Sequence, residues 1–590
     1  MEEITLTIDG IQVTAPKGST ILEAARVAGI NIPTLCYLKD VQNDIGACRI
    51  CVVEVEGSKK LAASCVFPAS EGMVVKTHTP KILDYRKKTL ELLLSNHNKD
   101  CLACVRNGNC ELQELCKQYG VTDSDFYSGE KTPTVIDDSA PHMIRDNSKC
   151  ILCRRCVAAC SNIQGVGILG ANNRGFHTEI GCAFDLPIGE TSCINCGQCI
   201  AVCPTGALRE KDNIDEVFDA INDPNKTVLV SAAPAVRAAI CESFEMPIGT
   251  DGQGRLAAAL RRLNFDKVFD TVFSADLTIM EEATELLDRI NNGGTLPLIT
   301  SCSPGWVKYC EHYYPEFTEN LSSCKSPQQM FGAVAKSYYA EEIGVSPENI
   351  VMVSIMPCTA KKYEIGRPDQ DANGVPDVDY VLTTRELGRM IKRAGIRFEE
   401  LPEEDFDKPL GLGTGAGVIF GATGGVMEAA LRTAVETLTG ESLDNESLEF
   451  KEVRGFAGIK EASYNVAGLE IKAAVASGLE NARELLDMVA RGEAEYHFIE
   501  IMACPGGCIN GGGQPHVPAG IRNFMDIREA RAKVLYDLDR SNTMRKSHEN
   551  PAIIEIYDKY LEKPGSKRAH ELLHTTYVKR TVNKPIKRNY

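Results

Sequence analysis

The segment Glu500–Pro515 (EIMACPGGCINGGGQP) carries two cysteines four residues apart, Cys504 and Cys508, in a stretch rich in glycine. Because glycine has no Cβ, backbone and sulfur atoms can close tightly around an inorganic group. A thiol pair in a chain without an export signal is more often a metal ligand or redox group than a disulfide. The segment therefore predicts a metal-binding loop whose remaining ligands lie elsewhere in the chain.

Composition narrows the class of protein. The chain has 590 residues, 24 of them cysteine, and a net charge of -17, which argues against a nucleic-acid partner because phosphate binding needs clustered Lys and Arg. We find no signal-peptide pattern and no apolar run of about 18 residues, so we expect a cytoplasmic protein without a membrane partner. Nearly all the cysteines fall into spaced groups, which indicates iron–sulfur ligation, with zinc as the main alternative.

Residues 1–80 are predicted to form a ferredoxin-like [2Fe–2S] domain. Ile4–Asp9 and Ile11–Thr14 alternate like the strands of a hairpin, and Thr20–Ala28 has the pattern of a capped helix. Four cysteines follow, in the spacing C-x11-C-x2-C with a distant fourth: Cys36, Cys48, Cys51 and Cys65. Plant-type ferredoxins have a similar spacing with a shorter first gap. We therefore expect a [2Fe–2S] cluster here rather than zinc.

A second motif lies in residues 81–125. Its spacing is H-x3-C-x2-C-x5-C, formed by His97, Cys101, Cys104 and Cys110. On spacing alone, a closed zinc site with one His and three Cys stays open. The position between two cluster domains favours a [4Fe–4S] centre. Cys116 fits no spacing and is interpreted as a structural thiol.

Residues 140–210 contain an internal repeat of the spacing C-x2-C-x2-C-x3-C. In bacterial two-cluster ferredoxins the fourth cysteine of each run ligates the other cluster. The first predicted [4Fe–4S] ligand set is Cys150, Cys153, Cys156 and Cys203. The second is Cys193, Cys196, Cys199 and Cys160. Cys182, between the runs, is not expected to be a ligand.

Residues 211–519 alternate apolar strands with amphipathic helices. This pattern predicts an α/β catalytic domain with two mostly parallel sheets and helices, preceded by α+β ferredoxin-like iron–sulfur domains. Cys302, Cys358 and Cys504 each follow a predicted strand, and loops after parallel strands meet at one edge. We therefore expect the three cysteines to converge. Gly411–Gly417 lacks the context of a nucleotide loop and is interpreted as flexible backbone near the site.

Three loops together resemble the signature motifs of the [FeFe]-hydrogenases: Thr300–Trp306 (TSCSPGW), Met356–Glu364 (MPCTAKKYE) and Glu500–Pro515. The resemblance covers nearly the whole chain. It is closest to the multi-cluster clostridial type and to the catalytic subunits of NAD(P)-linked hydrogenase complexes. It implies reversible hydrogen oxidation and proton reduction at an H-cluster, a [4Fe–4S] cubane joined through a cysteine sulfur to a diiron unit carrying CO, cyanide and azadithiolate. One [2Fe–2S] and three [4Fe–4S] clusters would relay the electrons.

The resemblance also implies roles in the pocket. Cys508 matches the bridging ligand, with Cys358 and Cys504 as further cubane ligands. Lys361 matches a residue that donates a charge-assisted hydrogen bond to a cyanide. The residues implied to shape the pocket are Ala233, Pro234, Gln328, Met356 and Met502.

A proton route is implied as well. Cys302 matches a thiol beside the diiron unit, and the next groups outward match Glu282, Ser322 and Glu285, with Arg289 at the outer end. The two glutamates are three residues apart on a helix predicted for 277–291, so they share one face. The alternative for this pattern is a solvated helix face.

Ser303 departs from the family pattern, which has a second cysteine, the fourth cubane ligand, at this position. Three arrangements are open: Ser303 ligates through oxygen, Cys302 moves into ligation, or Cys324 substitutes. Thiolate suits iron–sulfur clusters better than alkoxide. We therefore predict that Cys324 or Cys302 supplies the sulfur.

After Pro515 the pattern becomes helical. Residues 520–577 resemble a small-subunit segment that wraps the catalytic domain, and 578–590 form a basic tail. The sequence has no flavin or nicotinamide fingerprint. Ferredoxin, or a flavin- and NAD(P)-binding partner subunit, including an electron-bifurcating arrangement, is therefore the expected electron partner. The alternative functions are a hydrogenase-like iron–sulfur assembly protein and a hydrogen sensor.

Overall fold

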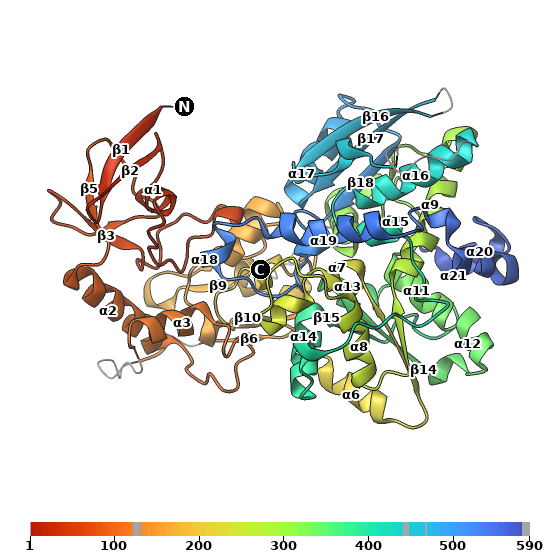
Figure 1. Ribbon diagram of the computed structural model, residues 1–590, viewed down its shortest axis with the longest axis horizontal. Coiled ribbons are helices and arrows are strands. Elements are labelled where there is room, and N and C mark those ends of the chain that lie inside the picture. Colours follow the sequence, from red (N-terminus) through yellow and green to blue (C-terminus); the bar gives the residue numbers. More distant parts are fainter. Residues whose placement is uncertain (1, 122–129, 133, 441–447, 467–468, 581–590) are drawn as a thin grey trace, which may run out of the picture.

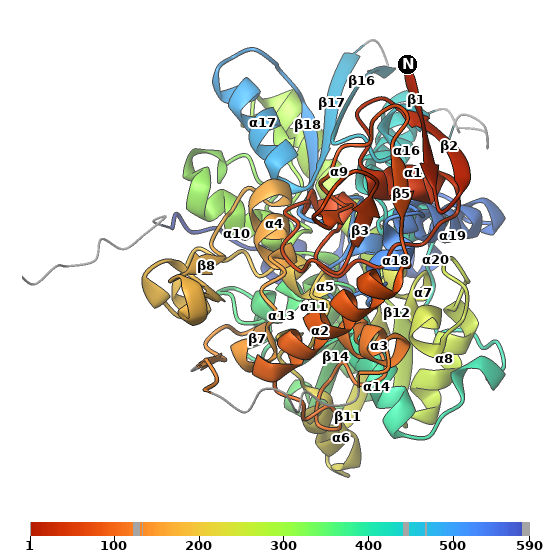
Figure 2. The same cartoon turned by 90° about the vertical axis from the view of Figure 1, so that its left-hand side faces the viewer.

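The computed structural model describes residues 2–121, 130–132, 134–440, 448–466 and 469–580. Figure 1 shows the N-terminal third on one side of the molecule and the α/β part on the other. In Figure 2, turned by 90°, the N-terminal sheet stands in front of the α/β part. No helix among these described residues is long and apolar enough to cross a membrane. The predicted basic tail lies outside the described residues beyond Arg580.

The N-terminal sheet has five strands in the order β2-β1-β5-β3-β4. Strands β1 and β2 pair antiparallel from Glu3↔Pro16 to Ile8↔Ile11, which confirms the predicted hairpin. Thr20 is the N-cap of α1 and forms a capping box with Glu23, as the sequence pattern predicts. The elements are β1 (Glu3–Ile8), β2 (Ile11–Pro16), α1 (Ile21–Val27), β3 (Val52–Val55), β4 (Ala62–Ala63) and β5 (Val74–Lys76).

The next part of the chain consists of two helices followed by short strands and helical turns. The bounds are α2 (Pro80–Asn96), α3 (Glu111–Gln118), β6 (Ile136–Asp137), β7 (Met143–Asp146), α4 (Arg155–Ala158), β8 (Gly170–Asn172), β9 (Glu179–Gly181), α5 (Gln198–Ala201) and β10 (Leu208–Glu210). Elements this short bury little apolar surface. The small hydrophobic cluster of this part of the chain includes Cys156, Cys182 and Cys203. Such a small core is typical of domains that depend on bound metal for stability.

Two four-stranded sheets form the centre of the α/β part. One has the order β12-β11-β14-β15 and is entirely parallel, and the other has the order β13-β18-β17-β16 with only β16 and β17 antiparallel. The strands are β11 (Thr227–Ala232), β12 (Lys267–Asp270), β13 (Leu298–Ile299), β14 (Ile350–Met356), β15 (Tyr380–Thr383), β16 (Ile459–Val466), β17 (Leu469–Ser477) and β18 (Phe498–Met502). Strand β14 is buried along its whole length, as expected for a parallel sheet covered on both faces.

Strand register decides where the cysteine loops meet. In the first sheet, β11 and β14 run in parallel from Thr227↔Ile350 to Ala232↔Ile355, so both end at the same edge. In the second sheet, Ile299 pairs with Ile499, so the loops after β13 and β18 also leave on one side. The loops after four strands of two sheets therefore face a common space.

Helices cover both sheets (Figure 1). They are α6 (Ile214–Asn222), α7 (Pro234–Arg237), α8 (Gln253–Arg262), α9 (Val272–Asn292), α10 (Pro304–Tyr313), α11 (Pro327–Ala335), α12 (Tyr338–Ile343), α13 (Ala360–Glu364), α14 (Thr384–Arg393), α15 (Gly415–Ile419), α16 (Gly425–Thr439) and α17 (Leu479–Ala490). Helix α9 begins five residues before the predicted start. Its first turns are buried on every side, including Ser274 and Asp276, so they lack the amphipathic period that marks a helix in a sequence.

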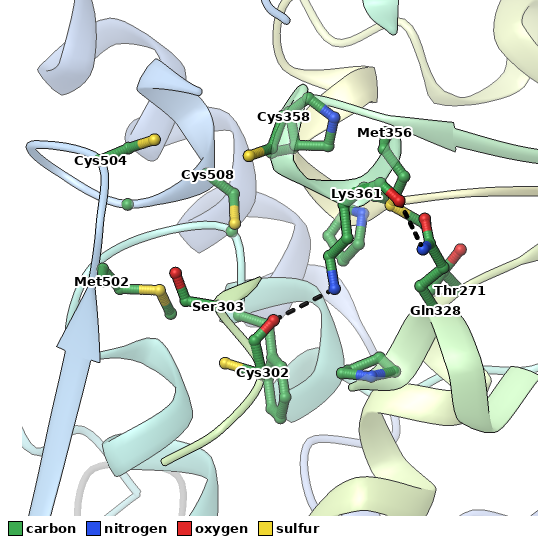
Figure 3. Close-up of a pocket in the computed structure, with 18 of the residues that line it drawn as sticks. Thr271, Cys302, Ser303, Gln328, Met356, Cys358, Lys361, Met502, Cys504 and Cys508 are labelled. Atoms are coloured by element: carbon green, nitrogen blue, oxygen red, sulfur yellow. Dashed lines mark hydrogen bonds between the residues drawn. The ribbon is translucent and has the colours of Figure 1, made fainter. Parts of the chain in front are cut away.

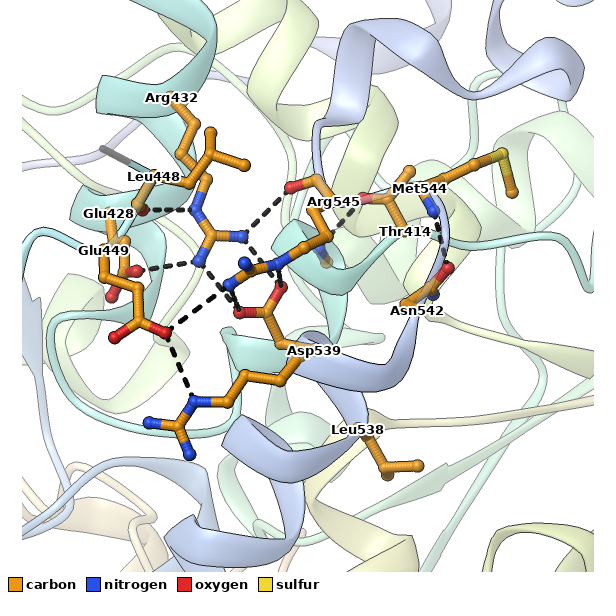
Figure 4. Close-up of polar contacts among 12 residues, drawn as sticks. Thr414, Glu428, Arg432, Leu448, Glu449, Leu538, Asp539, Asn542, Met544 and Arg545 are labelled. Atoms are coloured by element: carbon orange, nitrogen blue, oxygen red, sulfur yellow. Dashed lines mark hydrogen bonds and ion pairs between the residues drawn. The ribbon is translucent and has the colours of Figure 1, made fainter. Parts of the chain in front are cut away.

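The C-terminal segment wraps the α/β part through α18 (Ala519–Arg522), α19 (Ile527–Ser541), α20 (Pro551–Ile556) and α21 (Lys567–Leu573). Figure 4 shows the buried polar contacts that fasten it. The Arg432 guanidinium donates to both carboxylate oxygens of Asp539 at 2.9 Å, and the Arg545 guanidinium donates to Asp539 as well. Arg432 and Asp539 are both 0% exposed, and Glu428 also pairs with Arg432, so these buried charges compensate one another as a network.

The glycine-rich stretch Gly411–Gly417 is tightly packed rather than flexible, which corrects the prediction. A Cβ on Gly413 would lie 2.2 Å from Val272, and one on Gly415 would lie 2.1 Å from Asp539. These glycines allow the close approach of α9 and α19, with Thr414 as the N-cap of α15.

Candidate active site

A mostly apolar pocket lies where the loops after β11, β13, β14 and β18 meet (Figure 3). It brings together all five predicted pocket residues with Cys302, Lys361, Cys358, Cys504 and Cys508. The full lining also includes Ala235, Thr271, Ala275, Ser303, Pro304, Pro327, Pro357, Phe420, Gly421, Ala503 and Gly507. The predicted convergence of the three cysteine loops is therefore confirmed.

Three sulfur atoms face one another at one end of this pocket. Figure 3 shows the thiols of Cys358, Cys504 and Cys508 pointing into the same space. Cys358 and Cys504 are within hydrogen-bond range of each other. Gly507 has φ +94°, and a Cβ there would lie 2.7 Å from the Thr423 nitrogen, so only glycine lets the loop close over this space.

Ser303 lines the pocket and is a further ligand candidate. Figure 3 shows the Ser303 oxygen turned toward the Cys504 and Cys508 side, while the Cys302 sulfur points the other way. Cys324 is absent from the pocket lining. Its buried thiol lies 3.9 Å from Glu285 Oε2 instead. The prediction for Cys324 is therefore wrong, because the segment between α10 and α11 places this side chain beside Glu285 of α9.

Lys361 is held over the pocket by a network that the sequence analysis missed. Its Nζ donates to the Cys302 carbonyl at 3.1 Å and to Glu364 Oε2 at 3.0 Å. The same Glu364 oxygen accepts from Gln328 Nε2 at 3.0 Å and from Ser326 Oγ at 2.9 Å. Glu364 thus positions both Lys361 and Gln328. Its spacing of three residues from Lys361 on α13 was the signal available in the sequence.

Thr271 and Phe420 also line the pocket and were not predicted. Thr271 directly follows β12, so the rule that sites gather at strand ends identifies it. Phe420 lies just after α15, and no local pattern marks it, because its place depends on how α15 packs.

The predicted proton-route residues form a continuous series on α9 and the loop before α11. Ser322 Oγ donates to Glu285 Oε2 at 3.0 Å, and Arg289 donates to Glu285 Oε1 at 2.6 Å. Glu282 lies one turn before Glu285 on α9, and its Oε2 has no partner among the described residues. Glu282 is in turn the charged group with the largest influence on the Cys302 thiol.

Burial controls protonation along this series. Glu282 is 1% exposed. Burial, and then the negative charge of Glu285, raises the pKa of Glu282 to about 8. Burial likewise raises the pKa of the Cys302 thiol well above its ordinary value, and Glu282 adds to this effect. Both groups therefore carry their protons at neutral pH, as a relay in a water-poor pocket requires.

The four cysteines of the N-terminal domain lie together. The Cys36 sulfur is within hydrogen-bond range of Cys48 and Cys65, and Cys51 is within range of Cys65. All four are buried. Four thiols packed in mutual contact match the ligand set of a small cluster.

His97 and its three cysteines lie next to the two-cluster part. The His97 Nδ1 atom is buried and has no partner among the described residues. Burial, with the charge of Lys149, lowers the pKa of His97 to about 4. A neutral imidazole with a free buried nitrogen is in the state that metal ligation needs.

The eight cysteines of the repeat separate into two cavities. One is lined by Cys150, Cys153, Cys156 and Cys203, and the other by Cys160, Cys193, Cys196 and Cys199. The grouping matches the crossed ligand sets predicted from the spacing, while Cys116 and Cys182 line neither cavity.

Comparisons with known families agree with this arrangement. Residues 226–512 match "Iron only hydrogenase large subunit, C-terminal domain" and residues 525–580 match "Iron hydrogenase small subunit". Three iron–sulfur families match upstream: "2Fe-2S iron-sulfur cluster binding domain" at 1–80, "NADH-ubiquinone oxidoreductase-G iron-sulfur binding region" at 86–125 and "4Fe-4S dicluster domain" at 149–207. The chain belongs to the [FeFe]-hydrogenase (iron-only hydrogenase) family.

Within that family, the chain is similar to the NADP-reducing hydrogenase subunit HndD of Solidesulfovibrio fructosivorans. The two are 52% identical over 590 residues, covering 98% of this chain and 100% of the relative. Iron hydrogenase 1 of Clostridium pasteurianum is 44% identical over 575 residues, with 98% and 100% coverage. A solved structure of a variant of the [FeFe]-hydrogenase HydA1 of Chlamydomonas reinhardtii has a TM-score of 0.56 and 44% identity, covering 63% of this chain and 100% of its own. Protein NAR1 of Arabidopsis thaliana is more distant, at 32% identity over 65% of this chain and 84% of its own length.

Proposed function

We propose that this hydrogenase oxidises hydrogen and reduces protons reversibly at an H-cluster held in the pocket of Figure 3. The observation that carries the proposal is the convergence of Cys358, Cys504 and Cys508 on one apolar pocket beside Lys361 and Cys302. The pocket fits the group: it offers several sulfur donors, an apolar wall, one cation and glycine where the loop closes. When bound, the cluster supplies the redox chemistry and the site of hydrogen formation.

Four residues would hold the group. Cys358, Cys504 and Cys508 supply sulfur, and Cys508 is the proposed bridge to the diiron unit. Ser303 Oγ is the proposed fourth contact to the cubane, because it is the remaining donor turned toward these sulfurs. Lys361, fixed by Glu364, would present a cation to the cyanide ligands of the bound group.

The protein's own side chains contribute proton transfer to the mechanism. The Cys302 thiol holds a proton at the wall of the pocket. Glu282 replaces that proton, and Ser322 passes one from Glu285. The apolar lining keeps bulk water out, so protons must pass along these side chains rather than through solvent.

Electrons are proposed to reach the pocket through four accessory centres. The centre closest to it is the set containing Cys196, which lies near Cys358. The Thr359 hydroxyl, next to Cys358, donates to the Asn195 carbonyl, next to Cys196, at 2.8 Å. At Gly512 a Cβ would lie 2.1 Å from the Cys196 oxygen, which shows how closely the two sites are packed.

The proposed electron partner is a flavin- and NAD(P)-binding subunit, ferredoxin, or both. The printed name of the similar HndD protein, an NADP-reducing hydrogenase subunit, supports the first. Purification from its host under anaerobic conditions, followed by flavin analysis of what copurifies, tests this proposal. A chain that purifies alone and accepts electrons only from ferredoxin would contradict a flavin partner.

Hydrogen evolution from reduced methyl viologen by the matured protein tests the activity. We expect the wild type and Cys241→Ser, a buried thiol away from the pocket, to show activity and infrared bands of bound CO and cyanide. Cys508→Ala should lose both. Absence of those bands in active wild-type protein would overturn the assignment of the H-cluster.

A further inference from the structure

Among the described residues, the predicted proton route ends at Arg289, which cannot give up a proton to water at physiological pH. Arg289, which ends the series, is ion-paired with Glu285 and donates to the carbonyls of Thr295 and Leu321. A guanidinium keeps its proton throughout the physiological range and has no acceptor atom. Arg289 can therefore hold Glu285 in place but cannot relay its protons.

A histidine from the C-terminal segment reaches the same point. His574 directly follows α21, whose helix lies against α11. His574 forms a β-bridge with Cys324, and the Thr575 amide donates to the Ser323 carbonyl at 2.8 Å. A nitrogen of His574, the Cys324 sulfur and a carboxylate oxygen of Glu285 all lie within 4.8 Å of one another. One water molecule or the thiol itself spans such a gap.

Both ring nitrogens of His574 have polar partners. Nδ1 is 2.8 Å from Ser323 Oγ, and Nε2 is 3.1 Å from Glu281 Oε2. The side chain is only 8% exposed. Its ring centroid lies 4.0 Å from that of His570, which is exposed on α21. A buried imidazole is thus placed between Glu285 and an imidazole at the surface.

The groups that face His574 come from four elements. Glu281 and Glu285 belong to α9, Cys324 to the loop before α11, and His570 to α21. Tyr557, from the helical turn Tyr557–Leu561, donates its hydroxyl to Glu281. Histidine is the side chain suited to gain and lose a proton between pH 5 and 8.

We propose that His574, together with His570, connects Glu285 to solvent as a proton-exchange branch of the catalytic route. The inference rests on the proposed function. During hydrogen evolution, protonated His574 gives one proton to the Glu285 carboxylate and becomes neutral. It then regains a proton from solvent through His570. Hydrogen oxidation runs the same transfers in reverse, so each cycle of the branch moves one proton and no electrons.

Replacement of His574 by glutamine tests the branch. Glutamine can hydrogen-bond Ser323 and Glu281 but cannot carry a proton. With excess reduced methyl viologen, H574Q should evolve hydrogen about tenfold more slowly than wild type at pH 8. The deficit should shrink toward pH 6, because direct protonation of Glu285 from bulk water speeds up with proton concentration. The solvent deuterium isotope effect on the rate should rise.

The controls separate this role from a structural one. His548 lies in the same C-terminal segment and bonds Thr433 and Glu436, away from the route, so H548Q should keep the wild-type pH profile. H570Q should show a smaller deficit of the same sign. A loss in H574Q that is equal at every pH, with a lowered unfolding temperature, would show that the histidine only holds the segment. An unchanged rate at pH 8 would show that Glu285 exchanges protons with solvent directly.

The outcomes also distinguish failure of the branch from failure of the proposed function. If wild-type protein evolves hydrogen and Cys302→Ala does not, the route stands whatever H574Q does. If the matured wild type evolves no hydrogen, the proposed function itself fails.

Discussion

Glu282→Gln should stop proton delivery and at the same time make the fold less sensitive to alkaline pH. The carboxyl is 1% exposed, and burial followed by the charge of Glu285 raises its pKa from 4.5 to about 8. Between those pH values the folded chain binds more protons at this site than the unfolded chain. The free energy of unfolding therefore falls as the pH rises. This contribution is fully present below about pH 4.5 and is lost as the pH rises through 8.

The magnitude follows from the pKa. One pKa unit corresponds to about 1.4 kcal/mol, so the wild type should lose about 3 kcal/mol of stability at this site between pH 6 and pH 9. Glutamine does not titrate, so the variant should lose none there. For the α/β domain of residues 211–519, a difference of about 3 kcal/mol in stability corresponds to about 5 °C in the unfolding midpoint. Between pH 6 and pH 9, the unfolding midpoint of the variant should therefore rise by about this amount relative to that of the wild type.

Two assays check the prediction. Scanning fluorimetry at pH 6 and pH 9 gives the shift of the unfolding midpoint for the wild type and the variant. Hydrogen evolution from reduced viologen should fall by about 10²- to 10⁴-fold in Glu282→Gln, because a positioned proton carrier is removed. Asp288→Asn, an exposed residue on the same helix, should change neither readout. An equal pH response of the two unfolding midpoints, or near-normal activity of the variant, would refute the reasoning.

Three further changes test other parts of the site. Lys361→Met should lose the infrared bands of the diiron unit while the iron content of the cubane stays unchanged. Lys361→Arg should keep part of these bands, since it retains the charge next to Glu364. Equal bands in both variants would argue against a role for the cation. Ser303→Cys should raise the amount of iron bound per chain, and Ser303→Ala should lower it, because thiolate binds iron better than oxygen donors do. Iron analysis and electron paramagnetic resonance of the unmatured protein measure this amount. The same iron content in the wild type and both variants would exclude ligation at this position. Asp539→Ala should destabilise the chain by about 3 kcal/mol, because it removes the carboxylate shared by the buried Arg432 and Arg545 and leaves Arg432 only its second partner, Glu428. Urea unfolding measures this loss. Arg540→Ala removes an exposed ion pair on the same helix and should cost less than about 1 kcal/mol.

Much of the cluster chemistry was predictable from local sequence. Cysteine ligands within one motif are held by a short stretch of backbone, so spacing alone separates the two ferredoxin-like sets, including the exchange of Cys160 and Cys203. Strand alternation predicted the N-terminal hairpin for the same reason, because strand pairing across a tight turn is local. The class of protein and most of its proposed ligand positions follow from such short-range patterns.

The tertiary structure decided everything that depends on long-range packing. It places Cys324 outside the pocket and beside Glu285, and it brings His574, 250 residues later in the chain, to the same carboxylate. It also showed Glu364 as the group that positions Lys361 and Gln328. No spacing rule reaches such pairs, because they depend on how helices from distant segments pack. The loop Glu500–Pro515 alone predicts that metal is bound, while the pocket's proton supply exists only once α9, the loop before α11 and the C-terminal segment have folded together.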